Sequence, residues 1–86
     1  MLKGELKKLY NKLDKVGYRV EELEYREGYK PEIKVYPFVA NNDTWLEISF
    51  WEDSGLFIIV VYSNKLYDHT VYFKKLSSVV DLIENN

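Results

Sequence analysis

The sequence contains no cysteine and no glutamine, and it has one alanine, two prolines and four glycines among its 86 residues. The absence of cysteine excludes a disulfide framework, a thiolate zinc site, an iron–sulfur cluster and a cysteine nucleophile. Four scattered glycines form neither a phosphate-binding loop nor a dinucleotide-binding fingerprint. The chain lacks an apolar run of about 18 residues, and charges occupy its start where a signal peptide is apolar. We therefore expect a cytoplasmic protein that does not contact a membrane.

Aromatic side chains are abundant, with eight Tyr, four Phe and two Trp. Hydrophobic residues make up 47% of the chain and charged residues 30%, which is typical of a globular domain and not of a disordered segment. A chain of this length buries a limited share of its surface, so large aromatic residues help it to reach adequate stability by packing alone. We expect residues 1–86 to form a single α+β domain.

The net charge of −2 hides an uneven distribution of charge along the chain. Residues 1–19 hold six basic and two acidic residues, residues 20–62 hold three basic and nine acidic residues, and residues 63–86 hold three of each. An acidic chain of this kind is not typical of a general nucleic-acid binder, which needs a surplus of Lys and Arg. Either the basic or the acidic segment could steer a partner.

Hydrophobic spacing of three and four predicts a helix at each end of the chain. In the first helix the spaced residues are Leu2, Leu6, Leu9, Tyr10, Leu13 and Val16, and in the last they are Leu76, Val79, Val80 and Ile83. Gly17 is expected to end the first helix in a left-handed conformation. Ser77 or Ser78 is expected to cap the second helix.

Alternation of period two predicts five strands between the helices, over residues 18–25, 33–39, 44–52, 56–62 and 67–73. A bulge near Glu21 and Glu22 would reconcile the two parities of the first strand. Pro37 lacks an amide donor, so the second strand either lies at an edge or breaks there. The predicted fold is a five-stranded antiparallel meander with the N-terminal and C-terminal helices on one face, in the order α-β-β-β-β-β-α.

The third predicted strand has aromatic residues on both faces. If Leu46, Ile48 and Phe50 point at the helices, then Trp45 and Trp51 point away from them. Two exposed Trp side chains would indicate an interaction surface. The alternatives are that both lie in a second small core, under the Pro37 segment or the turn at residues 41–43, or that the face assignment is inverted.

Candidate catalytic and metal-binding residues are few. Alternation places Asp68 and His69 on opposite faces of the last strand, so the carboxylate is not expected to orient the imidazole. The acidic group Glu21, Glu22, Glu24 and Glu27 lacks the spacing of a calcium loop. We expect no enzyme, and no catalytic, metal or cofactor site.

The order helix, antiparallel strands, helix, with Lys74 and Lys75 at the start of the second helix, resembles double-stranded RNA-binding domains. The resemblance implies that these lysines grip phosphates of duplex RNA. Five strands stand where that family has three, and Leu76 to Val80 replace the family's small-residue helix.

In size, acidic balance and composition the chain resembles the inhibitors that phages carry against host nucleases, anti-CRISPR proteins among them, and some bacterial immunity proteins. We expect a small non-enzymatic protein that inhibits a larger, nucleic-acid-processing host protein by occluding its surface, with an RNA-binding module or a toxin immunity protein as alternatives. The apolar fourth strand and a free edge would also suit a homodimer. The expected partner-binding residues are Trp45, Glu47, Trp51, Glu52, Asp53, Glu21, Glu22 and Glu24.

Overall fold

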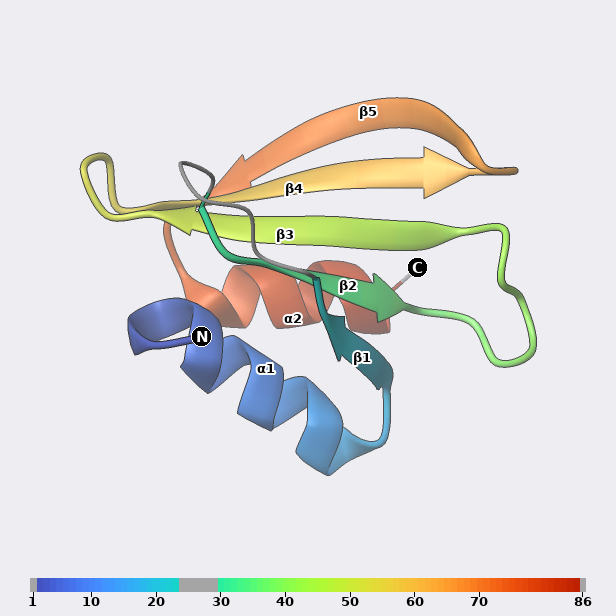
Figure 1. Ribbon diagram of the computed structural model, residues 1–86, viewed down its shortest axis with the longest axis horizontal. Helices are drawn as coiled ribbons and strands as arrows, with labels where there is room; N and C mark the ends of the chain where they lie inside the picture. The colour runs from blue at the N-terminus through green and yellow to red at the C-terminus, as the bar shows by residue number, and fades with distance from the viewer. Residues whose placement is uncertain (1, 24–29, 86) are drawn as a thin grey trace.

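The computed structural model describes residues 2–23 and 30–85 of the chain (Figure 1). Two helices flank five strands in sequence. The elements are α1 (Gly4–Val16), β1 (Arg19–Glu22), β2 (Glu32–Tyr36), β3 (Trp45–Trp51), β4 (Leu56–Ser63), β5 (Leu66–Phe73) and α2 (Leu76–Glu84).

The five strands form one antiparallel sheet in the order β1-β2-β3-β4-β5, so every strand pairs with its neighbour in the sequence. Both helices lie on the same face of this sheet (Figure 1). The helix α1 packs against β1, β2 and β3, while α2 packs against α1 and β5. The predicted α+β meander with two helices on one face is confirmed.

The core fills the space between the helices and the sheet face that they cover. The strands β2, β3 and β4 contribute alternate apolar residues and the helices contribute helically spaced ones, as the sequence pattern predicts, while β1 and β5 add only partly buried residues. Phe57 is the largest of the side chains that are fully buried there. The buried cluster consists of Leu2, Leu6, Leu9, Leu13, Ile33, Val35, Leu46, Ile48, Phe57, Ile59, Val61, Val79, Val80 and Ile83.

Gly17 ends α1 in the predicted left-handed conformation, with φ of 109°. Its amide donates to the carbonyl oxygens of Leu13 and Asp14, each at 3.1 Å. These bonds satisfy acceptors that the helix end would otherwise leave unpaired. The chain can then turn directly into β1.

Two local predictions are wrong, and a third is confirmed in one of its two alternatives. Neither Ser77 nor Ser78 caps α2, because the N-cap position falls on Lys75 and no side chain caps the helix. The pairing of β1 with β2 is regular through Glu21 and Glu22, so there is no bulge at this point. The strand β2 ends before Pro37, which agrees with a break at the proline and not with an edge position.

The turn between β4 and β5 requires positive φ at two residues that are not glycine. Asn64 has φ of 54° and Lys65 has φ of 66°. Two consecutive left-handed residues match the twist of a two-residue hairpin, although the second of these positions favours glycine. The amide of Lys65 also donates to the carbonyl oxygen of Asp43 at 2.8 Å, which ties this hairpin to the loop before β3.

Among the described residues, neither helix is long and apolar enough to cross a lipid bilayer.

Candidate functional site: the outer face of the sheet

The sheet face opposite the helices, called here the outer face, is not covered by any described helix or strand (Figure 1). Register and alternation define which side chains it carries. They are Arg19 and Glu21 of β1; Glu32, Lys34 and Tyr36 of β2; Trp45, Glu47, Ser49 and Trp51 of β3; Leu56, Ile58, Val60 and Tyr62 of β4; and Tyr67, Thr70 and Tyr72 of β5. Trp45 and Trp51 therefore point away from the helices, since Leu46 and Ile48 lie in the core.

A row of aromatic rings and cations crosses the outer face from β1 to β5. We name it the aromatic row, and it consists in order of Arg19, Tyr36, Lys34, Trp45, Tyr62 and Tyr67. The Arg19 guanidinium lies 3.8 Å from the centroid of the Tyr36 ring. The Lys34 ammonium lies 5.1 Å from the Tyr36 centroid and 4.3 Å from the Trp45 centroid. Such cation–π contacts and ring stacking hold the row together. Tyr36 is buried, with 8% of its surface exposed.

The Trp45 ring contacts groups from both neighbouring strands, Lys34 of β2 and Tyr62 of β4. Tyr62 stacks on it with centroids 5.0 Å apart and an interplanar angle of 14°, and Lys34 lies over it as well. Its indole N–H donates to Glu47 Oε2 at 2.9 Å. The ring of Tyr67 then meets Tyr62 edge to face at 6.3 Å. Trp45 is thus half-buried, with these neighbours on the outer face packed against its ring.

Trp51 lies at the other end of β3 and is more open, with 43% of its surface exposed. Its indole N–H donates to Ser49 Oγ at 3.2 Å, and the Lys30 ammonium lies 4.9 Å from its ring centroid. The chain then turns through the exposed residues Glu52 and Asp53. An exposed indole beside two carboxylates therefore marks this end of the outer face.

Two carboxylates of the outer face influence each other. Glu32 lies opposite Ser49 and Glu47 lies opposite Lys34, which makes the two glutamates diagonal neighbours on adjacent strands. Burial, together with the charge of Glu47, raises the pKa of Glu32 above its ordinary value. Burial and the same carboxylates, with Tyr67, raise the pKa of the Tyr62 hydroxyl.

The predicted partner-binding residues do not all share one surface. Trp45, Glu47, Trp51 and Glu21 lie on the outer face, and Glu52 and Asp53 extend it at the β3–β4 turn. Glu22 lies opposite Ile33 on the helix side of the sheet. Glu24 lies outside the described residues. Strand alternation therefore places Glu21 and Glu22 on opposite faces of the sheet.

Sequence reasoning missed five members of the aromatic row. They are Arg19, Lys34, Tyr36, Tyr62 and Tyr67. Lys34 and Tyr36 alternate with the core residues of their strand, which is a signal that the sequence does contain. The stacking of Tyr62 on Trp45 depends on the register of β3 against β4, and the sequence alone does not give that register.

The expectation that Asp68 and His69 point to opposite faces is wrong. The register of β5 shifts so that Tyr67 lies opposite Tyr62 and His69 opposite Val61, which leaves Asp68 as an extra residue. This bulge interrupts the alternation. The His69 Nδ1 and Asp68 Oδ2 atoms are 2.9 Å apart, although both side chains remain more than half exposed. Asp68 therefore contacts the imidazole of His69, contrary to the expectation from strand alternation.

The described part of the chain contains no group of three or more His, Cys, Asp or Glu side chains able to hold a metal ion. Comparison of the chain with protein-family models, with curated proteins and with solved structures gives no match.

Proposed function

We propose that this protein is a small binding protein that covers a surface of a larger protein with the outer face of its sheet. The observation that carries the proposal is the aromatic row on a sheet face without a covering layer. Isolated exposed apolar residues are ordinary, whereas contiguous aromatic surface rimmed by polar groups is typical of interaction sites. Tyr, Trp and Arg are also the residues that dominate binding energy at protein interfaces.

The geometry of the row favours a protein partner over single-stranded nucleic acid. Base stacking needs an open aromatic ring face, as in sheet platforms that bind RNA. On Trp45, Tyr62 stacks on the ring and the Lys34 ammonium lies 4.3 Å from the ring centroid, so both groups compete with a base for this ring. Carboxylates also alternate with the cations, and they would repel a phosphate backbone. The ring edges of the aromatic row, with cations and carboxylates between them, are better suited to contacts with the side chains of a folded protein.

The finer form of the proposal is an inhibitor that occludes a basic surface of a nucleic-acid-processing protein. Trp51 supports it, since this exposed ring is followed by Glu52 and Asp53. The indole would be the desolvated anchor, and the carboxylates would attract the basic surface and fix the orientation of the complex. In this proposal the inhibitor competes with nucleic acid for the same surface and performs no chemistry.

The test is affinity capture from a lysate of the cell in which the chain is expressed, with three forms of the bait. They are the unmodified protein, Trp51→Ala, and Leu66→Ala as the matched control. Leu66 is an exposed apolar residue opposite Ser63, and strand alternation places it on the other face of the sheet from Tyr67. We expect a partner that the unmodified protein and the control retain and that Trp51→Ala loses. Equal capture by all three baits contradicts the use of this face.

The RNA-binding alternative rests on Lys74 and Lys75, which are both exposed immediately before α2. It requires a mobility shift of duplex RNA by the protein, and loss of that shift when both lysines are replaced by Ala. Our proposal expects no shift at physiological salt. A shift that depends on these two lysines would replace protein occlusion by RNA binding as the function.

A further inference from the structure

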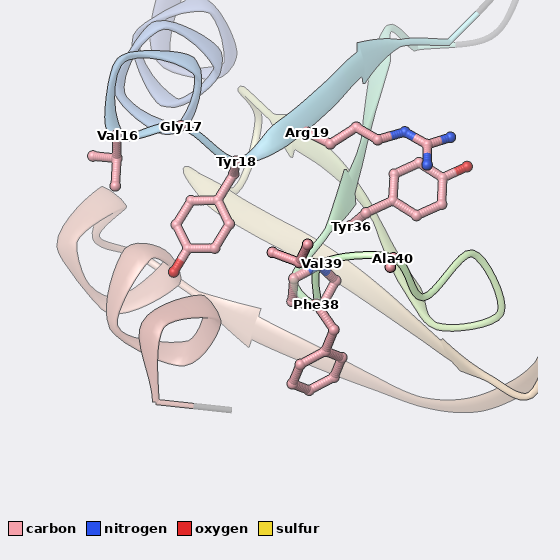
Figure 2. Close-up of a pocket in the computed structure, with 9 residues that line it drawn as sticks. Val16, Gly17, Tyr18, Arg19, Tyr36, Phe38, Val39 and Ala40 are labelled. Atoms are coloured by element: carbon pink, nitrogen blue, oxygen red, sulfur yellow. The ribbon is translucent and has the colours of Figure 1, made fainter.

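A pocket of about 480 Å³ opens at the end of the sheet where α1 leads into β1 and where β2 leads into the next loop. Residues 16–19 line one side and residues 36–40 line the other. Figure 2 shows Tyr18, Phe38 and Val39 projecting from these two segments, with Arg19 extended across the Tyr36 ring. Its volume lies within the range of sites that enclose small ligands or anchoring side chains.

The walls of this pocket are apolar and open to solvent. Val39 is 99% exposed, Val16 is 56% exposed and Phe38 is 41% exposed. Such exposure of one apolar residue is ordinary, but three of them around one concavity form a site where burial of apolar surface would be favourable. The protein leaves this surface uncovered among its described residues.

Arg19 is the one charged residue among the nine that line the pocket. In the last turns of α1 just before it, the exposed residues Lys12 and Lys15 outnumber the exposed Asp14. The Arg19 guanidinium is 3.5 Å from a Glu21 carboxylate oxygen, with both side chains about half exposed. The guanidinium also donates to the side-chain oxygen of Asn42. Because exposed ion pairs contribute little, a carboxylate from a partner can share or replace the contact with Glu21.

The pocket is continuous with the proposed interaction surface. Arg19 and Tyr36 line the pocket and also begin the aromatic row. The pocket lies at the opposite end of the sheet from the turn that holds Glu52 and Asp53 (Figure 1). A partner that covers the outer face would therefore meet a basic, apolar end and an acidic end.

We propose that this pocket receives a bulky apolar side chain of the protein partner, with a carboxylate beside it in the partner sequence that binds Arg19. The inference rests on the proposed protein-binding function and names the chemistry of the partner segment. The apolar side chain is the anchor, because it buries the exposed surfaces of Val16, Phe38 and Val39. The carboxylate fixes the direction in which the segment lies.

The test uses displayed short random peptides selected on the immobilised full-length chain. We expect the selected sequences to share an aromatic or branched aliphatic residue next to Asp or Glu. Their dissociation constants are then measured for the unmodified protein, Val39→Asp and Leu66→Asp. Val39 is fully exposed, so its replacement does not disturb the core, but it places an anion in the pocket wall. We expect about tenfold or greater weakening for Val39→Asp and no change for Leu66→Asp.

A second comparison isolates the carboxylate. Replacing the acidic residue of a selected peptide by its amide is expected to weaken binding to the unmodified protein about tenfold, and to have no such effect on Arg19→Gln. If Arg19→Gln binds the acidic peptide and the amide peptide equally well, the peptide carboxylate and Arg19 are energetically coupled. A protein that is only destabilised does not produce this result. Equal loss in both proteins overturns the role of Arg19.

Failure of this inference and failure of the proposed function give different results. If no peptide is enriched, or if Val39→Asp binds the selected peptides as tightly as the unmodified protein, the pocket is not the anchor site. In that case Trp51→Ala can still lose the partner that the unmodified protein captures, which would support the proposed function. If Val39→Asp fails to bind the peptides while Trp51→Ala captures a partner as the unmodified protein does, the pocket binds a partner segment. The proposed use of the outer face around Trp51 is then wrong.

Discussion

Trp45 and Tyr62 stack on the outer face of the sheet, with ring centroids 5.0 Å apart and planes only 14° from parallel. They face each other because β3 and β4 pair these two residues directly. An outer layer one side chain thick thus contributes to stability while it remains partly accessible.

The first prediction concerns the energy of this stacked pair. We expect Trp45→Ala to lower the free energy of unfolding by about 2 kcal/mol, less than for a fully buried Trp, because the ring is only half-buried. A double-mutant cycle with Tyr62→Ala is expected to give a coupling of about 0.5–1.5 kcal/mol. Urea unfolding measures both quantities. Additive losses would show that the stacking adds nothing beyond burial.

The more exposed Trp51 provides the comparison. Its replacement by Ala is expected to cost about 1 kcal/mol or less, since 43% of the side chain is already exposed to solvent. This difference makes Trp51→Ala the better variant for binding experiments, because lost binding then cannot be attributed to unfolding. Comparable destabilisation by the two Trp replacements would contradict the packing described for Trp45.

The second prediction concerns pH. Burial and the nearby Glu47 raise the pKa of Glu32 in the folded state, so the folded protein binds this proton more tightly than the unfolded chain does. The contribution of Glu32 to stability is therefore greatest below its ordinary pKa of 4.5, and it falls as the pH rises through the raised folded value. We expect Glu32→Gln to remove this loss, so that the stability of the variant relative to the unmodified protein increases as the pH rises above the ordinary pKa of Glu.

The pH prediction has a direct spectroscopic check. Carboxyl carbon chemical shifts should report a raised pKa for Glu32, which moves downward but stays raised in Glu47→Gln, since burial is the larger cause. A Glu32 pKa at its ordinary value would contradict the burial of this side chain.

The third prediction concerns the β4–β5 turn. Lys65 adopts φ of 66°, which is unfavourable for a residue with a Cβ. We expect Lys65→Gly to raise the free energy of unfolding by about 0.5–1 kcal/mol, because Gly removes the strain in this conformation. The lost ion pair with Asp43, at 3.7 Å between exposed groups, offsets little of this. Lys65→Ala is the control, since it removes the ion pair and keeps the strain, and it should not stabilise.

The fourth prediction concerns salt. If exposed carboxylates such as Glu52 and Asp53 oppose a basic surface, affinity for the captured partner should fall as ionic strength rises from low to physiological values. The association rate should account for most of the change, because steering acts before contact. Glu52→Gln with Asp53→Asn should reduce the salt dependence. Affinity that is independent of salt would argue for an interface held by the aromatic row alone.

Local patterns in the sequence specify the order of elements and place different side chains on the two faces of the sheet. The spacing of Leu6, Leu9 and Leu13 specifies one helical stripe, and the alternation around Leu46 and Ile48 places Trp45 and Trp51 on the other side of the sheet. These features follow from local periodicity, since 3.6 residues per turn and two residues per pleat are properties of the backbone.

Which side chains meet across the strands depends on how the strands pair in three dimensions. Register brings Tyr62 onto Trp45, and a bulge in β5 joins Asp68 to His69 against the expected alternation. The pocket likewise needs two segments that lie far apart in the sequence, of which Val16 and Val39 are members. Strand register and bulges arise from the packing of the whole sheet, and a one-residue shift reverses every facing side chain, so local sequence patterns do not fix them.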